Sequence, residues 1–111
     1  MEQIEWAIPY RLERPTGRNN VKVKKTTSNG TEYTEIQFYD SCCQNITNGD
    51  YLKAGVAATR IYFGKSNREN GFKIGHKYKE VRYIRFRGWR ERFAGMHELK
   101  FDSDSCLWYI E

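Results

Sequence analysis

The chain has 111 residues, of which 30% are charged and 15% aromatic, and its formal net charge is +5. This length is sufficient for one domain with its own hydrophobic core, and the aromatic content together with only two prolines argues against disorder. No run of 18 apolar residues is present and the N-terminal residues lack the pattern of a secretion signal, so we expect a single cytoplasmic domain, residues 1–111, without membrane contact.

The first predicted strand is Trp6 to Leu12. Pro9 interrupts it, and because proline cannot donate a ladder hydrogen bond, the strand is expected at a sheet edge or at a bend. The residues that follow, 14–20, are expected to form a loop.

Residues 21–39 predict a β-hairpin around Asn29-Gly30, the dipeptide that a two-residue type I′ turn prefers. Closing the hairpin there pairs Val21 with Phe38 and sets Lys24 opposite Glu35, a favourable cross-strand charge pair. One face of the hairpin is then expected in the core and carries Val21, Val23, Ile36 and Phe38. The other face is expected to meet water and carries Lys22, Lys24, Thr26, Tyr33, Glu35 and Gln37.

Beyond the hairpin, Asp40 is placed to cap a single helical turn that runs through Cys43 or Gln44. The rest of the chain shows no helical stripe of about ten residues or more, and its apolar stretches are short and separated by turn residues. These stretches are Tyr51–Ala57, Thr59–Phe63 and Phe72–Ile74, followed by a closing hairpin of His97–Phe101 with Cys106–Ile110.

These elements predict a mainly β fold, a single small domain of about six or seven short antiparallel strands. The strands are expected to form a curled sheet or a small barrel, with at most one or two short helical turns. One such turn is expected at Arg90 to Ala94.

The positive charge is concentrated in Lys77 to Phe93, where seven basic residues, two acidic residues and five aromatic residues lie within seventeen positions. The net charge of this basic segment is therefore +5, equal to that of the whole chain. A strand up to Arg87 is expected, with a bulge near Tyr83 or burial on both faces to explain a slip in its alternation. In a structural interpretation, its aromatic residues belong to the core and its arginines only solvate the outer face.

In a functional interpretation, the basic segment contacts a nucleic acid, either DNA or RNA, through phosphate contacts and base stacking. Arginine suits this role because its planar fork meets phosphate oxygens and stacks on rings. The residues expected to contact phosphate are Arg82, Arg85, Arg87, Arg90 and Arg92, and those expected to stack are Tyr83 and Trp89.

The alternative is a phage-type inhibitor or adaptor, similar to proteins that block host defence complexes, that docks on an acidic protein surface. Arginine and tryptophan at the centre of the basic segment would then carry the binding energy, as they do at many interfaces. A homodimer is also conceivable through sheet edges at Trp6–Leu12 or at the C-terminal strand.

Enzymatic chemistry has little support in the sequence, and no catalytic residue, metal site or cofactor is expected. Cys42, Cys43 and Cys106 lack zinc-finger spacing and are expected to be reduced, small semi-buried thiols. Glu98-Leu99-Lys100 matches a fragment of a nuclease motif, but such a match is expected by chance in a chain of this composition. A second basic cluster at residues 22–25 is expected to be largely cancelled by Glu32 and Glu35.

Overall fold

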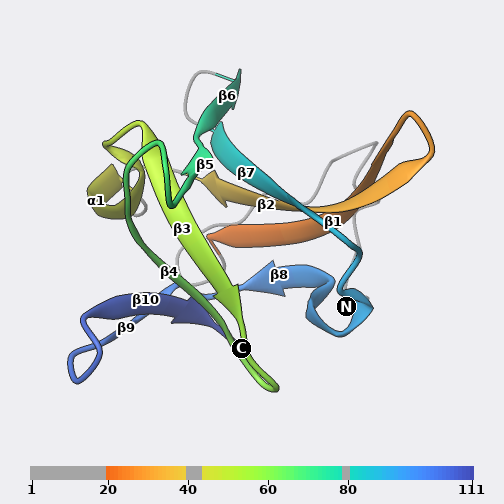
Figure 1. Ribbon diagram of the computed structural model, residues 1–111. Coiled ribbons are helices and arrows are strands. Elements are labelled where there is room, and N and C mark those ends of the chain that lie inside the picture. Colours follow the sequence, from red (N-terminus) through yellow and green to blue (C-terminus); the bar gives the residue numbers. More distant parts are fainter. Residues whose placement is uncertain (1–19, 40–43, 79–80) are drawn as a thin grey trace, which may run out of the picture.

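A computed structural model describes residues 20–39, 44–78 and 81–111, and within them the fold is mainly β, as predicted. The strands form two antiparallel sheets of five strands each, here named sheet A and sheet B (Figure 1). In spatial order, sheet A consists of β6 (Gly75–Tyr78), β7 (Val81–Arg87), β2 (Thr31–Tyr39), β1 (Val21–Ser28) and β8 (Gly95–His97). Sheet B consists of β5 (Phe72–Lys73), β3 (Tyr51–Val56), β4 (Ile61–Lys65), β10 (Leu107–Ile110) and β9 (Lys100–Asp102).

Two bent segments of chain join the sheets at their edges. Ile74 alone separates β5 from β6, and Glu98 with Leu99 separates β8 from β9, so each segment supplies an edge strand to both sheets. The arrangement is that of a flattened barrel whose corners are made by strands that switch sheets. The strand count exceeds the predicted six or seven because these bends split strands into pieces of two to four residues, too short to show an alternation.

The β1–β2 hairpin has the predicted register throughout. Val21 lies opposite Phe38 and Lys24 opposite Glu35, and the strands run to Ser28 opposite Thr31. The turn residues Asn29 and Gly30 have φ values of 50° and 78°, as a type I′ turn requires. Turn chemistry and alternation are local signals, and here they agree with the packed structure.

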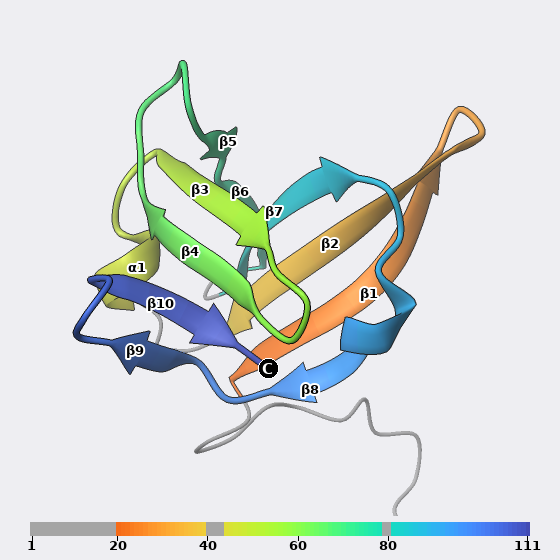
Figure 2. The same ribbon diagram turned by 60° about the horizontal axis from the view of Figure 1, so that its bottom comes forward.

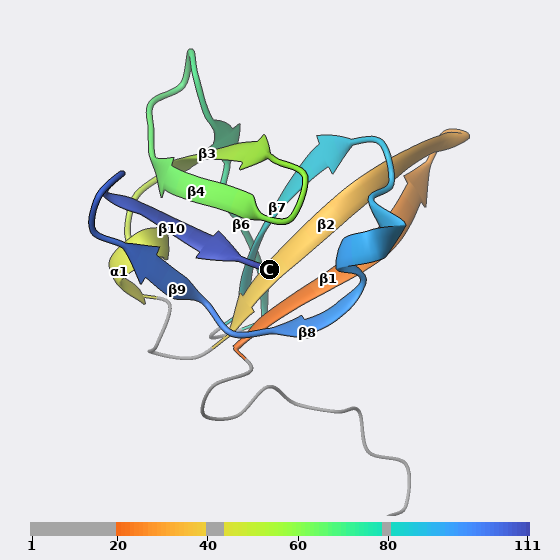
Figure 3. The same cartoon turned by 90° about the horizontal axis from the view of Figure 1, so that it is seen from below.

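The hydrophobic core lies between the two sheets, which occupy opposite sides of the molecule in Figures 2 and 3, sheet B at the left and sheet A at the right. Phe38 of sheet A and Phe63 of sheet B meet edge to face, with ring centroids 5.3 Å apart. Phe72 and Phe86 make a second contact at 6.0 Å. The buried residues of the core are Val21, Val23, Ile36, Phe38, Ile46, Leu52, Ile61, Phe63, Ile74, Ile84, Phe86, Phe93 and Ile110.

Two short helical elements cover the ends of the core. Helix α1 (Gln44–Thr47) contributes the buried Ile46, and the 3-10 turn η2 (Glu91–Phe93) confirms the turn predicted at residues 90–94. The predicted strand Trp6–Leu12 and the predicted cap Asp40 lie outside the described residues. Within the described part, no helix has the length and hydropathy needed to span a membrane.

Three expectations need correction: the free edge of the C-terminal strand, the strand that carries the bulge, and the burial of Cys106. The C-terminal strand β10 pairs with β4 on one side and β9 on the other, so it offers no free edge to a second chain. A bulge is present near Tyr83, as expected, but it lies on the neighbouring strand β6, between His76 and Tyr78, while β7 pairs with β2 residue for residue. Cys106 is exposed rather than semi-buried.

Candidate functional site

The outer face of sheet A, which points away from sheet B, gathers basic and tyrosine side chains from four strands. Ile36, Ile84 and Val23 point into the core, so the residues that alternate with them point outward. Register places Lys24, Glu35 and Arg85 in one row across β1, β2 and β7. We call this surface the basic face, and it comprises Lys22, Lys24, Tyr33, Glu35, Gln37, Tyr39, Lys77, Tyr83, Arg85 and Arg87.

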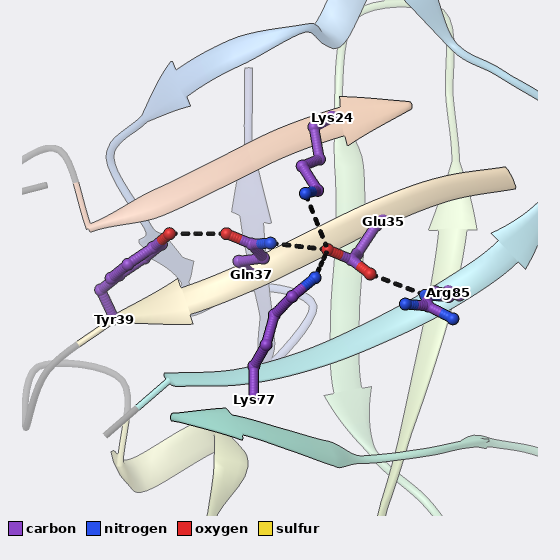
Figure 4. Close-up of polar contacts among 6 residues, drawn as sticks. All are labelled: Lys24, Glu35, Gln37, Tyr39, Lys77 and Arg85. Carbon is purple, nitrogen blue, oxygen red and sulfur yellow. Dashed lines mark hydrogen bonds and ion pairs between the residues drawn. The ribbon is translucent and has the colours of Figure 1, made fainter. Parts of the chain in front are cut away.

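Glu35 lies at the centre of the basic face and holds three cations. Its carboxylate accepts hydrogen bonds from Lys77 Nζ at 2.7 Å and from Arg85 Nε at 2.6 Å, while Lys24 Nζ lies 3.9 Å away. Gln37 Nε2 donates a further bond to Oε2 at 2.6 Å, and Tyr39 Oη donates to Gln37 Oε1 at 2.5 Å. Figure 4 shows the six side chains on one side of sheet A, with strands of sheet B behind them.

The burial of Glu35 and Gln37 corrects the prediction that both face water. The side chain of Glu35 is 0% exposed although it lies on the outer face, because the long side chains of Lys24, Lys77 and Arg85 close over it. Burial alone would raise the pKa of Glu35, but the hydrogen bonds from Lys77, Gln37 and Arg85 outweigh it and lower the pKa below its ordinary value. Glu35 is therefore a carboxylate at neutral pH.

The same contacts shift the pKa values of two of the cations. The hydrogen bond to Glu35 raises the pKa of Arg85, so this guanidinium stays charged. Burial and the neighbouring Lys77 lower the pKa of Lys24, in spite of the attraction of Glu35. The predicted Lys24–Glu35 pair is thus present. It belongs to a larger cluster in which one carboxylate forms ion pairs with three cations.

The basic face keeps a positive charge after this pairing. It holds five basic residues and one acidic residue, a net charge of +4. The cations bound to Glu35 remain partly accessible, with side chains 26% exposed for Lys77, 40% for Lys24 and 43% for Arg85. Among the residues that the structure describes, Lys22 and Arg87 make no ion pair.

Tyrosines lie between the basic side chains. Tyr83 is partly exposed, with the guanidinium of Arg85 4.9 Å and the ammonium of Lys77 5.4 Å from its ring centroid. Its ring covers Gly75 of the neighbouring strand, where a Cβ atom would come within 2.4 Å of the ring. Tyr33 and Tyr39, also partly exposed, lie along β2 on the same face.

The structure brings together only some of the residues predicted from the basic segment. Arg85, Arg87 and Tyr83 lie on the basic face, but Arg82 has the opposite orientation. Arg82 Nη1 donates to the carbonyl oxygen of Thr47 at 2.8 Å and contacts Thr47 Oγ1 at 3.3 Å. Arg82 shares its parity with the core residues of β7, a signal that the sequence already contained.

Trp89, Arg90 and Arg92 follow β7 and lie beyond the basic face. Trp89 packs against the core, whereas Arg90 and Arg92 are exposed. The turn is fixed by Thr34, whose buried hydroxyl donates to the carbonyl oxygen of Gly88 at 2.5 Å and accepts from the backbone N–H of Arg90 at 3.1 Å. Arg92 Nη2 donates to the carbonyl oxygen of Ala57 at 2.8 Å.

Sequence reasoning assigned Lys22, Lys24 and Tyr33 to a solvated hairpin face and did not connect them with the basic segment. The signal that joins them is the pairing of β2 with both β1 and β7, which cannot be read from either segment alone. In the described ranges, no group of three or more His, Cys, Asp or Glu side chains is arranged to hold a metal ion.

Comparisons with protein-family models, with curated proteins and with solved structures found no match to this chain. The basic face is therefore interpreted from its own chemistry, which combines accessible cations, tyrosine rings and a single buried carboxylate.

Proposed function

We propose that this chain is a non-enzymatic nucleic-acid-binding protein that contacts its ligand through the basic face. The observation that carries the proposal is the merging of cations from β1, β6 and β7 into one surface of net charge +4 beside tyrosine rings. Clustered cations attract a polyanion, and aromatic rings between them provide stacking surfaces for bases.

The basic residues of the face differ in how available they are to bind phosphate. Lys22 and Arg87 are the first candidates for phosphate binding, while Lys24, Lys77 and Arg85 are shared with Glu35. Between two and five phosphates are then neutralised. On a single strand this number predicts that log affinity falls with log salt at a slope between about −1.4 and −3.5.

A salt titration by fluorescence anisotropy with a labelled oligonucleotide tests the proposal. The double variant Lys22→Glu with Arg87→Glu reverses both freely available cations and is expected to weaken binding at least 10-fold at low salt. The matched control is Arg68→Glu with Lys73→Glu, which changes the net charge equally at exposed positions away from the basic face. A slope near zero for the unsubstituted protein, or equal losses in the two double variants, contradicts the proposal.

An acidic protein surface is the second ligand that a basic face can bind, as an inhibitor or adaptor would. The centre of such an interface was expected at the arginines and tryptophan of the basic segment, but Trp89 packs against the core and Arg82 binds Thr47. The same two residues were also expected among the nucleic-acid contacts, so their positions do not distinguish the two ligands. The tyrosine ring between the cations Lys77 and Arg85 is what favours a nucleic acid. Pull-down from a lysate with and without nuclease distinguishes the two, because a protein partner is retained after nuclease treatment.

A further inference from the structure

We propose that the ligand of the basic face is a single-stranded nucleic acid rather than a duplex, an inference that rests on the proposed function. Three features of the described residues carry it: the width of the face, the charge of the hairpin that projects from it, and the placement of its tyrosines. Each feature bears on how a polynucleotide can approach sheet A.

The basic face is too broad to enter a duplex groove. It covers the four adjacent strands β6, β7, β2 and β1. Neighbouring strands lie about 4.8 Å apart, so the backbones of β6 and β1 are separated by about 14 Å before side chains are added. The major groove of B-form DNA is about 12 Å wide and admits a helix or a two-stranded ribbon. The face therefore meets a ligand as a platform.

The tip of the β1–β2 hairpin, which continues two strands of the basic face, is narrow enough for a groove, but it carries no net charge. Residues 25–32 project beyond the rest of the molecule as a two-stranded ribbon (Figures 2 and 3). Its charged residues are Lys25 and Glu32, whose side chains pair at 3.3 Å. A ribbon that read a groove would face two phosphate backbones, and a neutral ribbon gains little from them.

The tyrosines suit unpaired bases. Tyr33 and Tyr39 lie on the same face of β2, six residues apart, which corresponds to about 20 Å along the strand. Tyr83 lies between them, opposite Gln37 on the neighbouring strand. Bases in a duplex are stacked on one another and hidden from such rings, whereas those of a single strand can turn toward them.

The test measures affinity by anisotropy at one fixed salt concentration for four ligands of equal length: single-stranded DNA, single-stranded RNA, duplex DNA and duplex RNA. At least one single strand is expected to bind 10-fold or more tightly than either duplex, and the two single-stranded arms decide between DNA and RNA. Equal or tighter binding of a duplex overturns the inference but leaves the proposed function intact. Binding of none of the four overturns both.

Removing the aromatic ring of Tyr33 tests base stacking independently of the comparison of ligands. Tyr33→Ala is expected to weaken single-strand binding roughly 5- to 100-fold while leaving duplex binding unchanged. Tyr33→Phe keeps the ring and is expected to bind as the unsubstituted protein does, which separates stacking from loss of folding. Tyr62→Ala is the matched control, because Tyr62 lies on the outer face of sheet B, beside Tyr109. Unchanged single-strand affinity in Tyr33→Ala, or an equal loss in Tyr62→Ala, overturns the stacking role.

Discussion

Replacing Glu35 with glutamine isolates the contribution of the buried carboxylate to stability. The substitution keeps the shape of the side chain but removes its negative charge. It also replaces one of the two oxygens that accept hydrogen bonds from Lys77 and Arg85 with an NH2 donor. A hydrogen bond to a charged group contributes about 1.5–3 kcal/mol, and two such bonds set an upper range of about 3–6 kcal/mol. The cations are 26–43% exposed and recover hydration, so we expect a loss of about 2–3 kcal/mol at neutral pH.

For a domain of this size, a loss of 2–3 kcal/mol lowers the melting temperature by roughly 10 °C. Denaturant unfolding and thermal melting both measure it. The matched control is Glu32→Gln on the same strand, because Glu32 is 53% exposed and pairs only with the exposed Lys25 among the described residues. That variant is expected to lose no more than about 0.5 kcal/mol.

The pH dependence gives the same prediction a second test. Because the pKa of Glu35 is lower in the folded state, its stabilisation is present above its ordinary pKa of 4.5 and is lost as pH falls through the lowered folded value. The stability difference between the unsubstituted protein and Glu35→Gln should therefore be constant near neutral pH and shrink below about pH 4.5. A difference that is the same at pH 7 and pH 3, or no difference at pH 7, would refute the reasoning.

Three smaller predictions concern backbone and packing. Thr34→Val removes both hydrogen bonds of the buried hydroxyl and should cost about 1–3 kcal/mol in denaturant unfolding, with Thr27→Val, exposed near the hairpin tip, as the neutral control. Gly75→Ala should displace the ring of Tyr83, seen as a change in tyrosine fluorescence that Gly55→Ala, which meets open space, does not produce. Gly30→Ala should cost about 1 kcal/mol in thermal unfolding, because φ is +78° there.

The hairpin could be predicted in full because its signals are local. Asn29-Gly30 fixes the turn, and the alternation of residues 21–39 selects a single register. The burial of Glu35 could not be predicted in this way, because two of the three side chains that cover it come from far along the chain. Lys77 is 42 residues away and Arg85 is 50. A charged residue on the outer face of a hairpin is ordinarily solvated, and only the pairing of β7 and β6 beyond β2 changes this.

For the basic segment, the sequence predicted the charge correctly, but the direction in which each arginine points was missed. Its charge could be read from the sequence, but a strand distributes successive residues to opposite faces. Arg85 and Arg87 share one parity and lie outside, while Arg82 shares the parity of Ile84 and Phe86 and lies on the core side. The prediction of a single binding patch assumed that all arginines of the basic segment lie on the same surface. Applying the alternation of its core residues to its arginines would have separated them.

Under the proposed function, removal of Glu35 is expected to lower stability but to make more positive charge available for binding. In the folded protein, Glu35 reduces the charge of the basic face and engages three cations that phosphate would otherwise attract. Below its melting temperature, Glu35→Gln should therefore bind single strands with a steeper salt dependence, by about 0.7 for each cation released and at most about 2 in total. An unchanged slope would mean that these cations contact phosphate while still bound to Glu35. A shallower slope would mean that the carboxylate places them for binding, so that its loss removes contacts.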